Sequence, residues 1–252
     1  MKMANILDRY GIKEVADVTF YEIDNDGKPS YPVLYLDTLK VSTIEQTAEN
    51  AEARGGKGNA ALITWDYGKE ITVTLEDALY SPKSLALMFG DKDGVTTSTT
   101  GIDIRKTVFK ENLSTTVTAT AAGSGTAAIK INGKTVNLTN CTFYDANGTV
   151  VSTGTSYVYV TGKVTLASAM TIDVSANGFP GTYYITGDTY ARREDNGTDE
   201  FFQFIIPKAK VLSESNTITL EAEGDPTVFS MSLKVLRPKS GEMMKLVQYT
   251  VS

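Results

Sequence analysis

Residues 70–76 have the sequence EITVTLE, in which polar and apolar side chains alternate without a break. Successive side chains of a β-strand point to opposite faces, so this period of two predicts a strand with Ile71, Val73 and Leu75 on a buried face. The other face carries only polar side chains, as is typical of an antiparallel sheet with one wetted side. The segment therefore indicates a mainly β fold.

Further strand patterns lie on both sides of this segment. Near the N-terminus, residues 15–23 and 31–41 flank Asn25-Asp26-Gly27, which favours a tight hairpin turn. Toward the C-terminus, strand patterns occupy residues 182–191, 200–212, 217–223 and 228–237. Within residues 217–223, Thr and Glu alternate with apolar residues as they do in residues 70–76. We expect these strands to form one β-sandwich or barrel-like domain.

The region between residues 42 and 76 predicts a helix, a loop and a hairpin. The sequence STIE at residues 42–45 has the pattern of a capping box, and Glu45, Glu49 and Glu52 would share one face of a short helix. The Gly-rich sequence GGKGN at residues 55–59 predicts the end of that helix and a mobile loop. We expect residues 61–65 and 70–76 to pair as a hairpin that turns near Tyr67-Gly68.

A packing helix and an insert are predicted in the middle of the chain. Residues 76–89 are the best helix candidate, and Pro82 suits the first position of a helical segment within them. Over residues 91–170, Thr, Ser, Ala and Gly become frequent while large apolar residues become sparse. We interpret residues 91–170 as a Thr/Ser-rich β insert in a discontinuous domain formed by residues 1–90 and 171–252.

Composition excludes several classes of site. The chain of 252 residues has a formal charge of −6, which argues against a nucleic-acid-binding protein. It contains no histidine, the commonest general base and metal ligand, and Cys141 is its one cysteine. We therefore expect no catalytic centre, no metal site and no cofactor. No apolar run approaches the roughly 20 residues of a membrane span, and no signal peptide is expected at the start.

Two glycine-rich motifs resemble nucleotide-binding loops. The sequence GSGTAA at residues 123–128 matches the dinucleotide pattern, but a strand pattern follows it where a helix is needed. The sequence GGKG at residues 55–58 lacks the spacing of a phosphate-binding loop. Both are better explained as flexible segments.

Two acidic motifs are also better explained as turns. Glu22, Asp24 and Asp26 have the spacing of a calcium loop, but Val33 stands where the bidentate glutamate is needed. A second acidic cluster flanks Asn196-Gly197, which predicts an exposed hairpin tip rather than a cleft that holds a catalytic carboxylate pair; its members are Glu194, Asp195, Asp199 and Glu200.

Four stretches of the chain resemble the tail-tube (major tail) proteins of long-tailed bacteriophages. They are residues 66–82, with the sequence DYGKEITVTLEDALYSP; residues 179–190, with FPGTYYITGDTY; residues 202–211, with FQFIIPKAKV; and residues 219–229, with TLEAEGDPTVF. They occur in the expected order and cover under half of the chain. Residues 91–170 match no part of that family.

This resemblance implies a β-sandwich or barrel-like domain with one packing helix, in subunits that form hexameric rings stacked into a tube. Hairpins of six subunits would then line a lumen through which double-stranded DNA passes without specific binding. Other tail proteins would be further partners, with no membrane, and assembly would occur in the host cytoplasm. The candidate lumen-facing residues are Glu70, Thr72, Thr74, Thr217, Thr219, Glu221 and Glu223. The candidate ring-stacking loop carries Glu45, Glu49, Glu52, Arg54 and Lys57.

Three other functions remain open from the sequence. A baseplate, tail-terminator or capsid-decoration protein would share the fold but not the tube. A carbohydrate-binding β-sandwich module would need exposed aromatic residues on one face. An enzyme would need a carboxylate pair, since no histidine is present.

Overall fold

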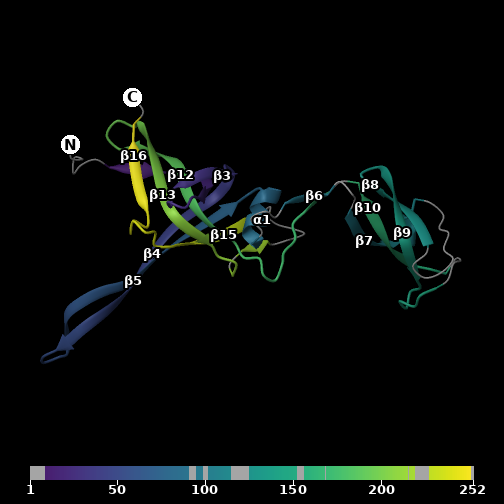
Figure 1. Cartoon of the computed structure of the whole chain (residues 1–252), viewed down its shortest axis with the longest axis horizontal. Helices are drawn as coiled ribbons and strands as arrows, with labels where there is room; N and C mark the ends of the chain where they lie inside the picture. Colours follow the sequence, from purple (N-terminus) through teal and green to yellow (C-terminus); the bar gives the residue numbers. More distant parts are fainter. Residues whose placement is uncertain are drawn as a thin grey trace. The chain divides into compact units, whose positions relative to one another are not determined.

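A computed structural model describes residues 9–90, 95–98, 102–114, 125–151, 156–167, 169–214, 216–218 and 227–250 (Figure 1). The chain divides into two compact units. We call residues 1–95 with 172–252 the body, and residues 96–171 the insert. The paired strands are antiparallel, and the expected mainly β fold is confirmed.

The body is built on one large sheet whose strand order is β3-β2-β12-β13-β15-β5-β4. Three short strands extend it, because β1 pairs with β12, β14 with β15, and β16 with β13. The bounds are β1 Tyr10–Ile12, β2 Asp17–Ile23, β3 Pro29–Leu36, β4 Leu39–Gly55, β5 Ala60–Asp77, β12 Thr182–Arg193, β13 Asp199–Val211, β14 Thr217–Ile218, β15 Phe229–Val235 and β16 Lys245–Tyr249.

The core of the body lies on one face of this sheet. Alternate residues of each strand are buried there, including Ile71, Val73 and Leu75 of β5, as the alternation predicted. Phe20 of β2 packs edge-on against Tyr183 of β12, with ring centroids 6.0 Å apart. Burying a large apolar side chain contributes about 1.5–3 kcal/mol, so this shared face provides most of the stability of the body.

The helix α1 (Pro82–Phe89) packs on the core through Leu87 and Met88. Ser81 caps its N-terminus by accepting a hydrogen bond from the Ser84 N–H, and Pro82 occupies the first turn as predicted. The helix begins later than the predicted residue 76. Strand β5 continues to Asp77, which pairs with β15, and the Asp77 carboxylate accepts hydrogen bonds from the Thr38 hydroxyl and the Leu79 N–H. Ladder bonds and this buried acid hold residues 76 and 77 in the sheet.

The Gly-rich sequence at residues 55–59 does form a turn, but the predicted helix before it and the predicted turn at Tyr67-Gly68 are wrong. Residues 42–52 form no helix but belong to β4, which pairs with β5 from Leu39 to Gly55. The turn lies at residues 56–59, where Gly56, Gly58 and Asn59 have positive φ. The predicted turn at Tyr67-Gly68 is absent because β5 runs unbroken through it. A partner strand of equal length satisfies the backbone of residues 42–52, and this long-range pairing overrides the local capping pattern.

The insert has a hydrophobic core of its own. Strands β7 (Ile102–Phe109), β10 (Tyr159–Leu166), β9 (Lys134–Tyr144) and β8 (Gly125–Ile131) form a four-stranded sheet in this order. Strands β6 (Thr96–Ser98) and β11 (Ala169–Thr171) pair separately, and a 3₁₀ turn, η1, spans Lys110–Asn112. The buried residues of the insert's core include Leu138, Phe143, Val160 and Val164. Strand β8 occupies the end of the GSGTAA motif, so the helix that a dinucleotide site requires is not there.

Candidate assembly surfaces

The outer half of the β4–β5 hairpin is a two-stranded ribbon, which we call the arm (residues 47–70). Strand β15 pairs with β5 only from Thr72 to Asp77, and among the described residues β4 pairs only with β5. Figure 1 shows the arm reaching beyond the other strands of the body. Nearly all of its side chains are exposed on both faces. A two-stranded hairpin is marginal in water by itself, so a partner that covers this arm would stabilise it.

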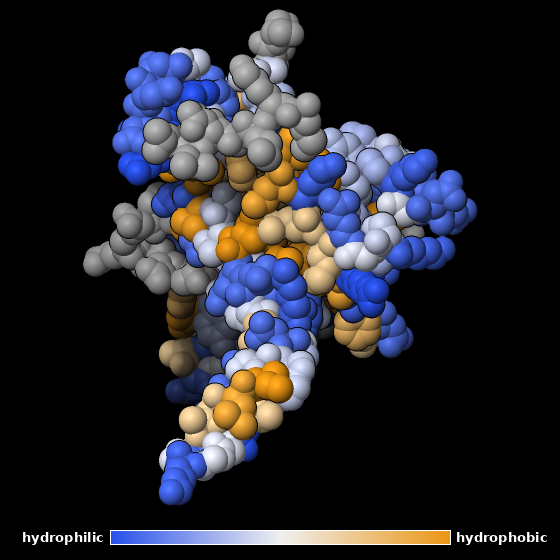
Figure 2. All heavy atoms as spheres, turned by 90° about the vertical axis from the view of Figure 1, so that its left-hand side faces the viewer, coloured by the Kyte–Doolittle hydropathy of each residue, from blue (hydrophilic) through white to orange (hydrophobic). Residues whose placement is uncertain are grey.

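One face of the arm carries an apolar stripe, formed by Ile63, Trp65 and Tyr67 with Ala51 and Ala53. In the strand register Trp65 lies opposite Ala51, Ile63 opposite Ala53, and Tyr67 opposite Glu49. Ile63, Trp65 and Tyr67 are each more than half exposed. Figure 2 shows hydrophobic side chains gathered on the projecting arm. Exposed apolar side chains gathered in one stripe make this face a candidate interaction site.

The opposite face of the arm is polar. Thr64 lies opposite Glu52, and Asp66 lies opposite Asn50. The arm is therefore amphipathic, and only one of its faces offers apolar contact. The sequence prediction missed the stripe, although the alternation of Ile63, Trp65 and Tyr67 was a readable signal.

A β-bulge at Gly68 decides which face the stripe occupies. Between the pairs Thr47–Glu70 and Glu49–Tyr67, one residue of β4 lies opposite two residues of β5, Gly68 and Lys69. Gly68 has a φ of 63°, a conformation that favours glycine. The extra residue inverts the alternation. The stripe consequently lies on the same side as Glu70 and the other polar residues of β5, not on the core side.

The predicted lumen-facing residues of β5 lie together on the outward face of the body's sheet. Thr72 pairs with Lys234 and Thr74 with Ser232 of β15, and Lys234 Nζ lies 2.6 Å from Glu70 Oε1. Thr217 pairs with Ser230 of β15, and Ser230 pairs on its other side with Glu76 of β5. Thr217 therefore belongs to the same face. Thr219, Glu221 and Glu223 lie outside the described residues. The outward face thus combines hydroxyls with charged groups.

The five predicted stacking residues are spread over both faces of the hairpin. Glu45, opposite Thr72, and Glu49, opposite Tyr67, share the face of the apolar stripe. Glu52 lies on the polar face and forms an ion pair of 2.5 Å with Arg54. Lys57 lies in the turn at the tip. The single helical face predicted for Glu45, Glu49 and Glu52 is wrong because a strand has a period of two.

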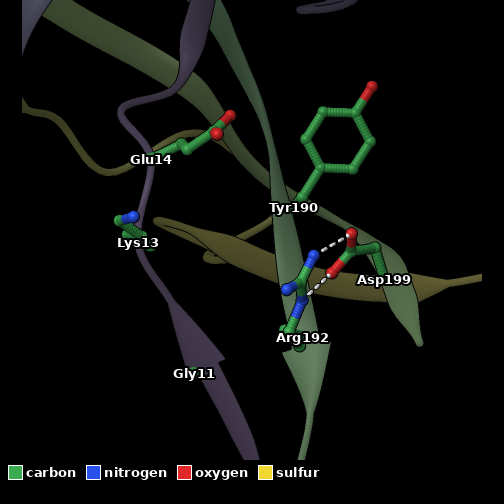
Figure 3. Close-up of a pocket in the computed structure, with 6 residues that line it drawn as sticks. All are labelled: Gly11, Lys13, Glu14, Tyr190, Arg192 and Asp199. Carbon is green, nitrogen blue, oxygen red and sulfur yellow. Dashed lines mark hydrogen bonds and ion pairs between the residues drawn. The ribbon is translucent and has the colours of Figure 1, made fainter. Parts of the chain in front are cut away.

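The acidic residues near residue 196 form ion pairs with arginine side chains. Figure 3 shows Arg192 bound to Asp199 through two contacts, of 2.6 and 2.7 Å, beside Tyr190 in a shallow pocket of about 430 Å³. Arg193 binds Asp195 at 2.8 Å. Arg192 lowers the pKa of Asp199, and Arg193 that of Asp195, through these hydrogen bonds. Both carboxylates are therefore ionised at neutral pH and cannot serve as proton donors.

The remaining acids of this cluster also face arginine. Glu200 lies 3.6 Å from Arg193, and Glu194 lies 3.7 Å from Arg9. The calcium-like turn is a hairpin turn, as expected, since Asp24 Oδ1 accepts hydrogen bonds from the N–H groups of Asp26 and Lys28. Within the described ranges no group of three metal-ligating side chains occurs. No described helix is long and apolar enough to cross a membrane.

The chain matches the sequence model of a protein family. A sequence model of the YomU/Tube protein family matches residues 10–248, nearly the whole chain. The matched range covers the arm, the insert and nearly all of the body, so the expectation that residues 91–170 match no part of the family is wrong. A comparison with curated proteins found no match.

Proposed function

We propose that this chain, which belongs to the YomU/Tube protein family, is the subunit of a bacteriophage tail tube and assembles into stacked hexameric rings. The family agrees with the resemblance seen in the sequence. In this proposal the rings form the conduit for genome ejection, the partners are further copies and other tail proteins, and the subunits assemble in the host cytoplasm.

The arm is the observation that carries this proposal. It exposes Trp65 and its neighbours on a ribbon that no third strand of the described body supports. A second copy of the chain would bury the stripe and stabilise the ribbon, and such a contact adds subunits in one direction. Contacts between two different surfaces of identical subunits generate rings or filaments. The arm, with Glu45, Glu49, Glu52, Arg54 and Lys57, is therefore our candidate for the contact between rings.

The net negative charge of the body supports the proposal that the tube conducts DNA. The insert holds six basic and three acidic residues, so the body keeps 18 of the 24 basic and 27 of the 30 acidic residues of the chain. An acidic body repels phosphate, which suits a wall past which DNA must slide. We propose that the outward face with Thr72, Thr74, Thr217 and Glu70 lines the lumen, together with Thr219, Glu221 and Glu223.

Negative-stain electron microscopy of the purified chain at high concentration tests this function. We expect hollow tubes of uniform diameter with six subunits in each ring. Single rings that never stack would indicate a baseplate or terminator component instead. Protein that stays monomeric at every concentration would refute self-assembly.

A further inference from the structure

The outward face of the insert carries a row of three aromatic side chains. Tyr159 of β10 pairs with Phe109 of β7 on one side and with Tyr144 of β9 on the other. The two tyrosine rings stack with centroids 5.0 Å apart, and Phe109 meets Tyr159 edge-on at 6.4 Å. Phe109 remains 56% exposed. The core of the insert lies on the other side of the sheet, so the row is not needed to fill it.

Hydroxyls and charges follow this row along the same face. Thr161 pairs with Thr107 and with Thr142, which places three hydroxyls side by side. The next pairs along β10 are Lys163 with Arg105 and Thr165 with Asp103.

Asp103 organises the far end of this face. Its carboxylate accepts hydrogen bonds from Lys163 Nζ at 2.7 Å and from the Thr165 hydroxyl at 2.6 Å. These contacts lower the pKa of Asp103, so it stays an acceptor at neutral pH. The face thus offers an apolar end, a row of hydroxyls and a polar end with both donors and acceptors.

The insert also differs in charge from the rest of the chain. Its six basic and three acidic residues make it net positive, within a chain of charge −6. A positive unit on an acidic protein attracts anions to itself, an effect that an evenly acidic chain would not have.

We propose that this face of the insert binds an anionic polysaccharide. A sugar ring has apolar C–H groups that pack on an aromatic ring such as Phe109, and hydroxyls that hydrogen-bond to threonine, aspartate and lysine. Arg105 and Lys163, the basic residues on this face, favour acidic polymers over neutral ones. Nucleic acid fits less well, because bases stack on open ring faces and Tyr144 and Tyr159 cover one face of each other. The insert would then hold the particle to an acidic surface, a role separate from building the tube.

Retention of the full-length chain on polysaccharide beads tests this proposal. The beads carry polygalacturonate, neutral dextran or single-stranded oligo(dT). We expect retention on polygalacturonate, weaker binding to oligo(dT), and none on dextran at physiological salt. Phe109→Ala should reduce retention about threefold to tenfold. Arg105→Gln should reduce both retention and its dependence on salt.

Two control variants match these changes away from the face. Tyr31→Ala removes an exposed aromatic residue of the body, and Lys134→Gln removes a charge at the β8–β9 turn; neither should change retention. Absence of retention on polygalacturonate would overturn the proposal. So would equal retention on oligo(dT), or an unchanged Phe109→Ala variant, because both indicate attraction by charge alone. None of these outcomes bears on tube assembly, which electron microscopy reports separately.

Discussion

The ring of Phe204 occupies the space where a side chain at Gly187 would lie. The two residues pair across β12 and β13, and a Cβ added at Gly187 would lie 2.1 Å from the Cε1 and Cζ atoms of that ring. Phe204 is almost completely buried in the core of the body. Glycine at residue 187 is therefore a packing requirement, which the sequence pattern of β12 does not reveal.

Gly187→Ala should destabilise the body. The Phe204 ring must leave its position, and overpacking of a core typically costs about 1–3 kcal/mol. Urea denaturation should show a lower midpoint with an unchanged slope. Gly11→Ala is the matched control, since no atom lies within 4 Å of a Cβ added there. Equal stability of the two variants would contradict the packing argument.

Trp65→Ser should impair assembly and leave the subunit folded. The side chain is 54% exposed, so the free energy of unfolding of the monomer should change by only about 0.5 kcal/mol. Truncation of a buried interface tryptophan typically costs about 2 kcal/mol or more, so assembly should need at least about tenfold more protein. Light scattering against concentration measures this. Thr64→Ala, on the polar face of the arm, should assemble normally; a similar defect there would refute a one-sided contact.

Deleting Gly68 should leave the stripe on the same face of the ribbon. The deletion restores one-to-one pairing with Tyr67 still opposite Glu49, so Ile63, Trp65 and Tyr67 keep their side and only the local bend of the bulge is lost. Electron microscopy should still show tubes, and circular dichroism should stay that of a β protein. Gly68→Ala keeps the residue count and costs about 1 kcal/mol through its positive φ, so it should assemble as well. Loss of tubes in the deletion variant alone would show that the bend at the bulge, and not only the face of the stripe, sets the contact.

A chain in which Val95 is joined directly to Ile172 should fold and form tubes. Among the residues that the structure describes, the core of the body contains none from the insert, and the insert contains a separate core. A cooperative unfolding transition and tubes of normal diameter are the expected results. A protein that is insoluble or unfolded after this deletion would make the insert integral to the body.

Thr72→Lys combined with Thr74→Lys should slow DNA release from particles that carry the variant. Both threonines lie on the outward face of β5, where two added ammonium groups would attract phosphate. Higher salt should restore the release rate, because it screens this attraction. Thr126→Lys, at an exposed position in the insert, is the control. Unchanged release at low salt would remove this face from the lumen.

Local sequence pattern predicted the structure correctly where a strand is flanked by two other strands of the body. The alternation of Ile71, Val73 and Leu75 predicted their burial, and Pro82 predicted the start of α1. Local pattern failed for residues 42–52, where a capping box and spaced glutamates suggested a helix. Each short-range helix signal contributes about 1 kcal/mol or less to stability. The pairing of these residues with a partner strand of full length contributes more.

The sequence by itself determined the mainly β class, the core face of β5, and the absence of histidine chemistry. It did so because side-chain period and composition are local properties of the chain. Only the tertiary structure decided that residues 39–77 form one long hairpin and that Gly68 is a bulge rather than a turn. The φ of Gly68 is compatible with a bulge or a turn, and the pairing register of β4 with β5 selects the bulge. That register also decided which face of the arm exposes Trp65.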